Sequence, residues 1–150
     1  MRDRPRITKR YLACYGALYG DVEAPKPRKK RIKKEGEKSE QQEQYAVHDW
    51  MTKKGIIHHH SPNGGKRNQW EGVKFKAMGV SPGYPDLTIP YARKGHHGLY
   101  IELKRVSGGK LSSYQEFWRD HLLSEGYYWA EAKGATECIN IICDYLEIDK

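Results

Sequence analysis

The amino-acid sequence predicts one α/β domain, preceded by a basic segment. From residue 40 onward, helix-like and strand-like residue patterns alternate, which favours an α/β domain over a helical bundle or a β-sandwich. The 150 residues are 37% hydrophobic, which is enough for one modest core and too little for two full domains. The chain contains no internal repeat that would point to a solenoid.

A helix is the first predicted element of this domain. Ser39–Gln42 has the pattern of a capping box, so the helix is expected to begin near Glu40. An apolar stripe follows at helical spacing, and Gly55 is a natural stop. A strand, a turn and a second helix are then expected at residues 56–60, 62–65 and about 70–77.

The second half of the domain is predicted to hold three strands and two helices. The strands are expected at residues 86–90, 99–106 and 127–130. Ser112 caps the first of the two helices, which Gly126 ends. The second helix is expected at about residues 135–146, and Pro90 should lie at a strand end or on a sheet edge.

Most of the positive charge lies near the N-terminus. The chain carries 27 Lys and Arg against 19 Asp and Glu, a net charge of +8. Residues 1–40 hold 13 of the basic and 6 of the acidic residues. The charge is densest at residues 26–34, around Lys29, Lys30 and Arg31, which suggests contact with a polyanion.

We therefore expect two parts, a basic and partly flexible arm at residues 1–38 and a folded domain at residues 39–150. Two interpretations of the arm remain open. In one, the arm neutralises backbone phosphates of DNA with little sequence preference. In the other, it is a solvated linker that keeps the protein soluble.

Composition also restricts the compartment and the cofactors. Three cysteines without a CxxC pattern argue against a disulfide scaffold and favour a reducing, cytoplasmic location. No apolar run approaches the roughly 20 residues of a membrane span, and neither membrane insertion nor a signal peptide is expected. The sequence lacks a GxxxxGK[ST] loop, so no nucleotide cofactor is expected.

Asp86, Glu102 and Lys104 carry the strongest chemical prediction. Glu102 and Lys104 are two apart on one strand, so their side chains share a face. If strands 86–90 and 99–106 pair as a hairpin, Asp86 approaches Glu102. Two converging carboxylates suit Mg²⁺ or Mn²⁺, and an adjacent lysine can orient a water or stabilise developing negative charge. The alternative is an ordinary surface ion pair.

Two further features each leave two interpretations. Glu43 lies at the edge of the apolar stripe of the first helix. In one interpretation its carboxylate needs a hydrogen-bond partner or a metal there. In the other it is simply an acid near the helix N-terminus, which the helix dipole favours. The pair Gly64-Gly65, followed by Lys66 and Arg67, could present backbone N–H groups to a DNA phosphate. The same pair also fits a plain hairpin turn.

Other conspicuous residues favour structural interpretations. His58, His59 and His60 are not accompanied by Cys or acidic residues at a standard zinc spacing, so strand packing or phosphate contact is favoured over zinc. The four tryptophans fall mainly on helical stripes or in a strand, which indicates core packing rather than base stacking.

Several motifs match one family in order along roughly residues 40–132. They are Gly64–Arg67, Gly83–Leu87, Tyr100–Lys104, Ser112–Gln115 and Gly126. With these motifs the chain resembles the small stand-alone viral and bacterial members of the VRR-NUC family, the virus-type replication-repair branch of the PD-(D/E)xK nucleases. The resemblance implies an αβββαβ core with a mixed central sheet flanked by helices. It also implies a homodimeric, metal-dependent DNA-repair endonuclease for flaps or Holliday junctions, in a bacterial or phage-infected cell.

The resemblance also implies residue roles. Lys104 would serve the attacking water, and Gln115 would support Lys104 or that water. The implied metal ligands are Asp86, Glu102 and the backbone carbonyl of Leu103. Glu43 would contact a metal or its water shell. The implied cofactor is Mg²⁺ or Mn²⁺.

Three functions remain in competition. The first is a structure-specific endodeoxyribonuclease, which the acids, Lys104 and Gln115 support. The second is a non-catalytic nucleic-acid-binding protein, which would bind DNA in a salt-sensitive way without a metal-dependent product. The third is a sequence-specific restriction-type endonuclease, for which the sequence shows no recognition module.

Overall fold

The computed structural model describes residues 39–61, 77–107 and 109–150. The elements in chain order are α2 (Glu40–Lys53), β1 (His59–His60), β2 (Leu87–Ile89), β3 (Leu99–Lys104), α4 (Ser113–Ser124), β4 (Tyr128–Lys133) and α5 (Gly134–Leu146). All of them belong to one compact unit, whose described residues are 39–61, 83–107 and 109–150, while residues 77–82 belong to a second unit. The predicted arm and turn lie outside the described residues, as does nearly all of the predicted helix near 70–77.

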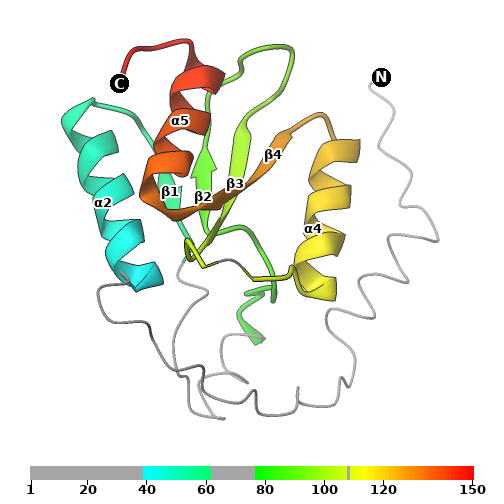
Figure 1. The fold of residues 1–150 in the computed structure, drawn as a ribbon. Coiled ribbons are helices and arrows are strands. Elements are labelled where there is room, and N and C mark those ends of the chain that lie inside the picture. Colours follow the sequence, from blue (N-terminus) through cyan, green and yellow to red (C-terminus); the bar gives the residue numbers. More distant parts are fainter. Residues whose placement is uncertain (1–38, 62–76, 108) are drawn as a thin grey trace, which may run out of the picture. The chain divides into compact units, whose positions relative to one another are not determined.

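The four strands form one mixed sheet in the order β1-β2-β3-β4 (Figure 1). β1 pairs antiparallel with β2, and β2 pairs antiparallel with β3, with Leu87 opposite Ile101. β3 and β4 are parallel, with Leu99 opposite Tyr128, because the chain crosses over through α4 between them. The predicted hairpin and the predicted α/β class are confirmed.

Local sequence signals account for both ends of α2 and for the start of α4. Ser39 accepts a hydrogen bond from the Gln42 backbone N–H, and the Gln42 side chain bonds back to Ser39, which completes the predicted capping box. Gly55 follows the helix with φ of 68°, a left-handed conformation that glycine adopts without strain. Ser112 and Gln115 form the same kind of box at the start of α4.

The hydrophobic core lies between one face of the sheet and the helices α2 and α5 (Figure 1). Leu99, Ile101 and Leu103 alternate along β3 and are buried on this face. They pack with residues of both helices, among them Val47, Met51, Cys138, Ile142 and Tyr145. Tyr100 points to the opposite face, where α4 lies, and an aromatic chain runs from it through Tyr84 to Trp118.

All four strands differ from the predicted lengths. β2 has three residues instead of five and β3 has six instead of eight, and the differences in β1 and β4 have identifiable causes. β1 has two residues instead of five, because the backbone groups before it form hydrogen bonds with side chains rather than with β2. Tyr91 Oη accepts from the Ile57 N–H, and His58 Nδ1 donates to the Ile56 carbonyl. β4 is longer than predicted and ends at Lys133, because all six of its residues are in register with β3. Tertiary contacts therefore set the lengths of β1 and β4.

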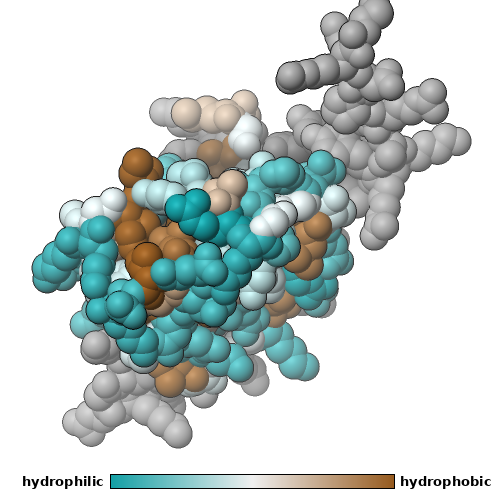
Figure 2. All heavy atoms as spheres, turned by 90° about the horizontal axis from the view of Figure 1, so that it is seen from above, coloured by the Kyte–Doolittle hydropathy of each residue, from teal (hydrophilic) through white to brown (hydrophobic). Residues whose placement is uncertain are grey.

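The described surface is mainly hydrophilic in the view of Figure 2, with hydrophobic residues in small separate groups. The exposed large hydrophobic side chains are Tyr45, Ile57, Met78, Val106, Leu123, Tyr128 and Ile148. Among the described residues, no helix combines the length and the hydrophobicity needed to cross a membrane.

Candidate active site

The pairing of β2 with β3 brings the two predicted carboxylates together. Asp86 directly precedes β2, and the register of Leu87 opposite Ile101 places Asp86 beside Glu102. Both side chains are buried, with exposed fractions of 6% for Asp86 and 4% for Glu102. The backbone N–H of Leu103 donates to Asp86 Oδ2 at 2.9 Å, which fixes the first carboxylate against the second strand.

Lys104 and Gln115 complete a hydrogen-bonded network around Glu102. Lys104 Nζ donates to Glu102 Oε1 at 2.9 Å and to Gln115 Oε1 at 3.0 Å. Gln115 Nε2 donates to the same Glu102 oxygen, and its Oε1 also accepts from the Ser112 N–H at 2.9 Å. The capping box of α4 therefore orients Gln115 toward β3 and its two charged neighbours there.

Burial gives the two carboxyls unusual acidities. It raises the pKa of Asp86 to about 6, although the hydrogen bond from Leu103 opposes the change. Burial also raises the pKa of Glu102 to about 7, and the negative charge of Asp86 adds to the increase while Lys104 opposes it. Two acids that share a site and resist ionisation together bind a cation well, because the cation offsets both charges.

Glu40 is the acidic residue of α2 whose charge acts on this pair. Its charge raises the pKa of both Asp86 and Glu102. Its Oε2 lies 3.8 Å from Arg105 Nε, just beyond the end of β3. Sequence reasoning missed Glu40 because it weighed only the acid on the apolar stripe. The position of Glu40 in the first turn of α2, one turn before Glu43, was the available signal.

Comparison with solved structures finds the same fold and a related sequence. A structure titled "VRR_NUC domain protein" matches with a TM-score of 0.65 and 32% sequence identity, over 79% of this chain and 94% of that chain. The chain belongs to the VRR-NUC family. No family model and no curated protein matches the sequence. The family is one of nucleases, and the VRR-NUC resemblance noted in the sequence is confirmed.

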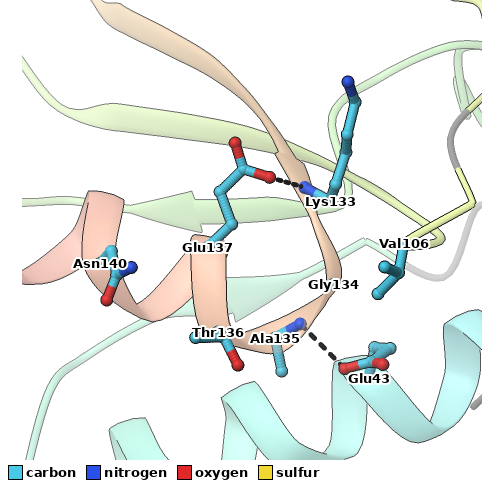
Figure 3. A pocket seen from close by; sticks show the side chains of 8 residues that line it. All are labelled: Glu43, Val106, Lys133, Gly134, Ala135, Thr136, Glu137 and Asn140. Atoms are coloured by element: carbon cyan, nitrogen blue, oxygen red, sulfur yellow. Dashed lines mark hydrogen bonds between the residues drawn. The ribbon is translucent and has the colours of Figure 1, made fainter.

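The VRR-NUC fold places Glu43 at the amino end of α5 (Figure 3), and its contact with the metal or its water shell stays a prediction. Glu43 is buried, and its Oε2 accepts a hydrogen bond of 2.8 Å from the Ala135 N–H. Glu137 Oε2 accepts from the neighbouring Lys133 N–H at 2.7 Å. These acids line a cavity of about 420 Å³ together with Val106, Lys133, Gly134, Ala135, Thr136 and Asn140. Glu43 therefore has the hydrogen-bond partner that its position on the apolar stripe requires, and that partner is the Ala135 N–H of α5 rather than the amino end of its own helix.

The remaining predicted site residues fall into two groups. Leu103 lies in β3 with its side chain in the core, and the role of its carbonyl as a ligand stays a prediction. The predicted DNA-binding residues lie outside the described residues: Gly64, Gly65, Lys66, Arg67, Lys29, Lys30 and Arg31.

The residues present fit a hard divalent cation in a VRR-NUC site. The hydrogen bonds engage Asp86 through Oδ2 and Glu102 through Oε1, which leaves Oδ1 and Oε2 outside those bonds. Within the described part of the chain, no three His, Cys, Asp or Glu side chains converge as a ligand set. Mg²⁺ needs fewer protein ligands, because it usually retains several waters and binds through one or two carboxylates.

Proposed function

We propose that this chain is a metal-dependent, structure-specific endodeoxyribonuclease that hydrolyses phosphodiester bonds in branched DNA, such as a Holliday junction or a flap. The observation that supports it is the buried pair Asp86 and Glu102, linked to Lys104 and Gln115 by hydrogen bonds. An ordinary surface ion pair does not bury two acids beside each other, because each buried charge carries a desolvation cost. Family membership supports the nuclease class, and the hydrogen bonds among these four residues support the roles proposed for them.

Asp86 and Glu102 would hold Mg²⁺ or Mn²⁺, with the Leu103 carbonyl as a further ligand. When bound, the metal would polarise a phosphoryl oxygen and lower the pKa of a coordinated water. The hydrogen bonds from Leu103 and Gln115 keep the two carboxylates oriented for this role.

Lys104 would orient the attacking water and stabilise the negative charge that develops on the phosphate. Its ammonium group has three N–H donors, and two of them are directed to Glu102 and Gln115. The third would donate to water or phosphate. Because both partners are buried or half-buried, the ammonium is held in place before DNA binds, which reduces the reorganisation needed during reaction.

Gln115 would hold Lys104 and Glu102 in register with each other. It contacts both side chains and is itself fixed by the Ser112 N–H. Glu40 would contribute negative charge near the cation, and Glu43 would contact the metal or its water shell, as the family resemblance implies. The ion pair with Arg105 keeps Glu40 close to the end of β3.

DNA contacts outside the catalytic site belong to the basic residues of the sequence. Lys66 and Arg67, beside Gly64 and Gly65, would bind phosphates, and the arm around residues 29–31 would add salt-sensitive affinity. Removal of residues 1–36 should therefore weaken DNA binding and flatten its salt dependence. A homodimer is part of the proposal, since two coordinated sites suit a two-fold junction.

The decisive experiment is a cleavage panel of four-way, flap, splayed and linear duplex DNA, with and without Mn²⁺. Wild type should cut a branched substrate only with metal, and Asp86→Ala should bind the same DNA without cutting it. Salt-sensitive binding with no product under any divalent metal would instead leave a non-catalytic binding protein. A defined cut sequence in linear duplex would indicate a restriction-type enzyme.

A further inference from the structure

The backbone carbonyl of Asp86 accepts two hydrogen bonds from consecutive residues. The Ser61 N–H donates at 2.9 Å, and His60 Nδ1 lies 2.8 Å from the same oxygen. A carbonyl oxygen only accepts, so the proton of this second bond is on Nδ1 of His60. The Ser61 contact continues the pairing of β1 with β2, whereas the His60 contact is an additional bond made by a side chain.

Asp86 is thereby held at both of its ends. Its carbonyl is attached to the β1 side of the sheet, and its Oδ2 accepts the Leu103 N–H on the β3 side. The remaining oxygen, Oδ1, lies in a direction set by these three bonds. A carboxylate ligand binds a cation strongly only if its oxygen is already aimed, so each of the three bonds bears on metal affinity.

The local architecture explains why a side chain is needed at this point. β1 has only two residues and lies at the edge of the sheet, so few ladder bonds hold it to β2. A strand end with so few bonds opens readily. The ring of His60 adds a third point of attachment, next to the residue whose orientation matters most.

The three consecutive histidines have distinct surroundings. His58 donates from Nδ1 to the Ile56 carbonyl, and its Nε2 lies 2.8 Å from His48 Nδ1 on α2. His59 is exposed, sits opposite Thr88 in the β1–β2 register, and points to the other face of the sheet from its neighbours. Of the three, His60 is the one whose ring bonds to Asp86.

We propose that His60 is a positioning residue for Asp86, acting through the hydrogen bond from Nδ1 to the Asp86 carbonyl. The inference rests on the proposed function in that it takes Asp86 to be a ligand of the divalent cation. His60 itself touches neither substrate nor metal in this role.

Substitutions that move the donor test the role of Nδ1. In His60→Asn the side-chain amide nitrogen occupies nearly the place of Nδ1, whereas in His60→Gln it lies near the place of Nε2. The control is His59→Asn, on the same strand and on the other face. Mn²⁺ binding is measured by calorimetry on the full chain without DNA, and thermal melts establish that each variant is folded.

His60→Gln and His60→Ala should bind Mn²⁺ roughly 10-fold more weakly than wild type, as is typical when a partner of a metal ligand is lost. His60→Asn and His59→Asn should bind Mn²⁺ with affinities within about twofold of that of wild type. The same order should appear in the Mn²⁺ concentration needed for half-maximal cleavage, with DNA affinity unchanged.

Three outcomes would overturn the inference. The first is that His60→Ala binds Mn²⁺ as tightly as wild type. The second is that His60→Gln, and not His60→Asn, keeps the wild-type Mn²⁺ affinity. The third is that the wild type binds no Mn²⁺. If the wild type binds Mn²⁺ and the variants follow the expected order but no DNA is cut, the positioning role stands and the proposed nuclease activity fails. If cleavage occurs but the variants do not follow the order, the activity stands and the positioning role fails.

Discussion

Gln115 donates from Nε2 to Glu102 while its Oε1 accepts from the Ser112 N–H that begins α4. One side chain therefore both caps a helix and braces a candidate metal ligand on β3. The rotation of α4 about its axis is thereby linked to the geometry of the site. The two roles of Gln115 can be separated, because they use different atoms.

Substitution of Gln115 by Glu should keep the cap and impair the site. A carboxylate oxygen still accepts from Ser112 and Lys104, but its negative charge replaces the amide donor beside Glu102. We expect cleavage to fall about 10- to 100-fold with little change in the melting temperature. Gln115→Ala should lower both activity and stability, the latter by about 1 kcal/mol. Equal losses of stability in the two variants would contradict this separation, and Glu116→Ala on the exposed side of α4 is the control.

Neutralising Asp86 should abolish metal binding and yet stabilise the metal-free protein at pH 8. In Asp86→Asn a side-chain oxygen can still accept the Leu103 N–H, while one of two neighbouring buried negative charges is lost. The melting temperature without metal should rise at pH 8, and calorimetry should detect no Mn²⁺ binding. A lower melting temperature together with intact cleavage would show that Asp86 is a structural residue.

The stability of the metal-free protein should fall as the pH rises from about 4 to about 8. The pKa values of Asp86 and Glu102 rise on folding from 3.8 and 4.5 to about 6 and about 7. In that window the folded chain holds more protons than the unfolded chain, so a higher pH lowers the free energy of unfolding. Below this pH window both carboxyls are protonated in the folded and in the unfolded chain, and their contribution to the free energy of unfolding is fully present.

Mn²⁺ affinity should change in the opposite direction over the same window. The metal competes with protons for the two carboxylates, so binding should strengthen from pH 5 to pH 8 and release protons. Melting curves at several pH values, with and without Mn²⁺, check both trends. Because other groups also titrate, the comparison is the difference between wild type and Asp86→Asn, and a pH-independent difference would refute the assignment.

Glu40 and Glu43 should have separable roles although they lie one turn apart on α2. Glu43→Ala leaves the Ala135 N–H without its buried partner, and we expect a loss of about 1–3 kcal/mol in stability. Glu40→Gln should leave stability within about 0.5 kcal/mol of wild type, as for a half-exposed residue, and weaken Mn²⁺ binding. The reverse pattern, with Mn²⁺ binding lost only on changing Glu43, would instead support the predicted metal role of Glu43.

Gly83 should be intolerant of any side chain. Its φ is 72°, and a Cβ there would lie 2.6 Å from both the backbone carbonyl carbon and the Cβ of Tyr114 in the first turn of α4. Gly83→Ala should push α4 and Gln115 away from β3, which lowers both stability and cleavage.

Gly95 has a similar φ of 80° with nothing within 4 Å of the added Cβ. Gly95→Ala therefore measures the backbone strain alone, about 1–2 kcal/mol. Equal effects of the two substitutions would show that the contact with α4 is unimportant.

Much of the fold was predictable because its signals are local. The capping boxes at Ser39 and Ser112 and the stop at Gly55 depend on residues a few positions apart, and all three are present in the structure. The alternation along β3 correctly separated the buried Leu99, Ile101 and Leu103 from the face that carries Glu102 and Lys104.

Other features depend on contacts between distant segments, which residue patterns do not specify. Glu43 meets Ala135, 92 positions away, and this contact depends on how α2 and α5 pack together. The shortening of β1 depends on Tyr91, which is far from β1 in the sequence. The extension of β4 depends on its parallel register with β3.

The sequence by itself determined the α/β class, the ends of the main helices and the identity of Asp86, Glu102 and Lys104 as candidate site residues, while Gln115 was implied by the family resemblance. It could do so because helix caps, strand alternation and the E-x-K spacing arise from bonds and periodicities within a few residues. Only the tertiary structure decided that the charge of Glu40 reaches the carboxylate pair, that Glu43 binds the amino end of α5, and that His60 holds Asp86. Those relationships follow from the rotation of packed helices and the register of paired strands, which are set by the shape of the whole core.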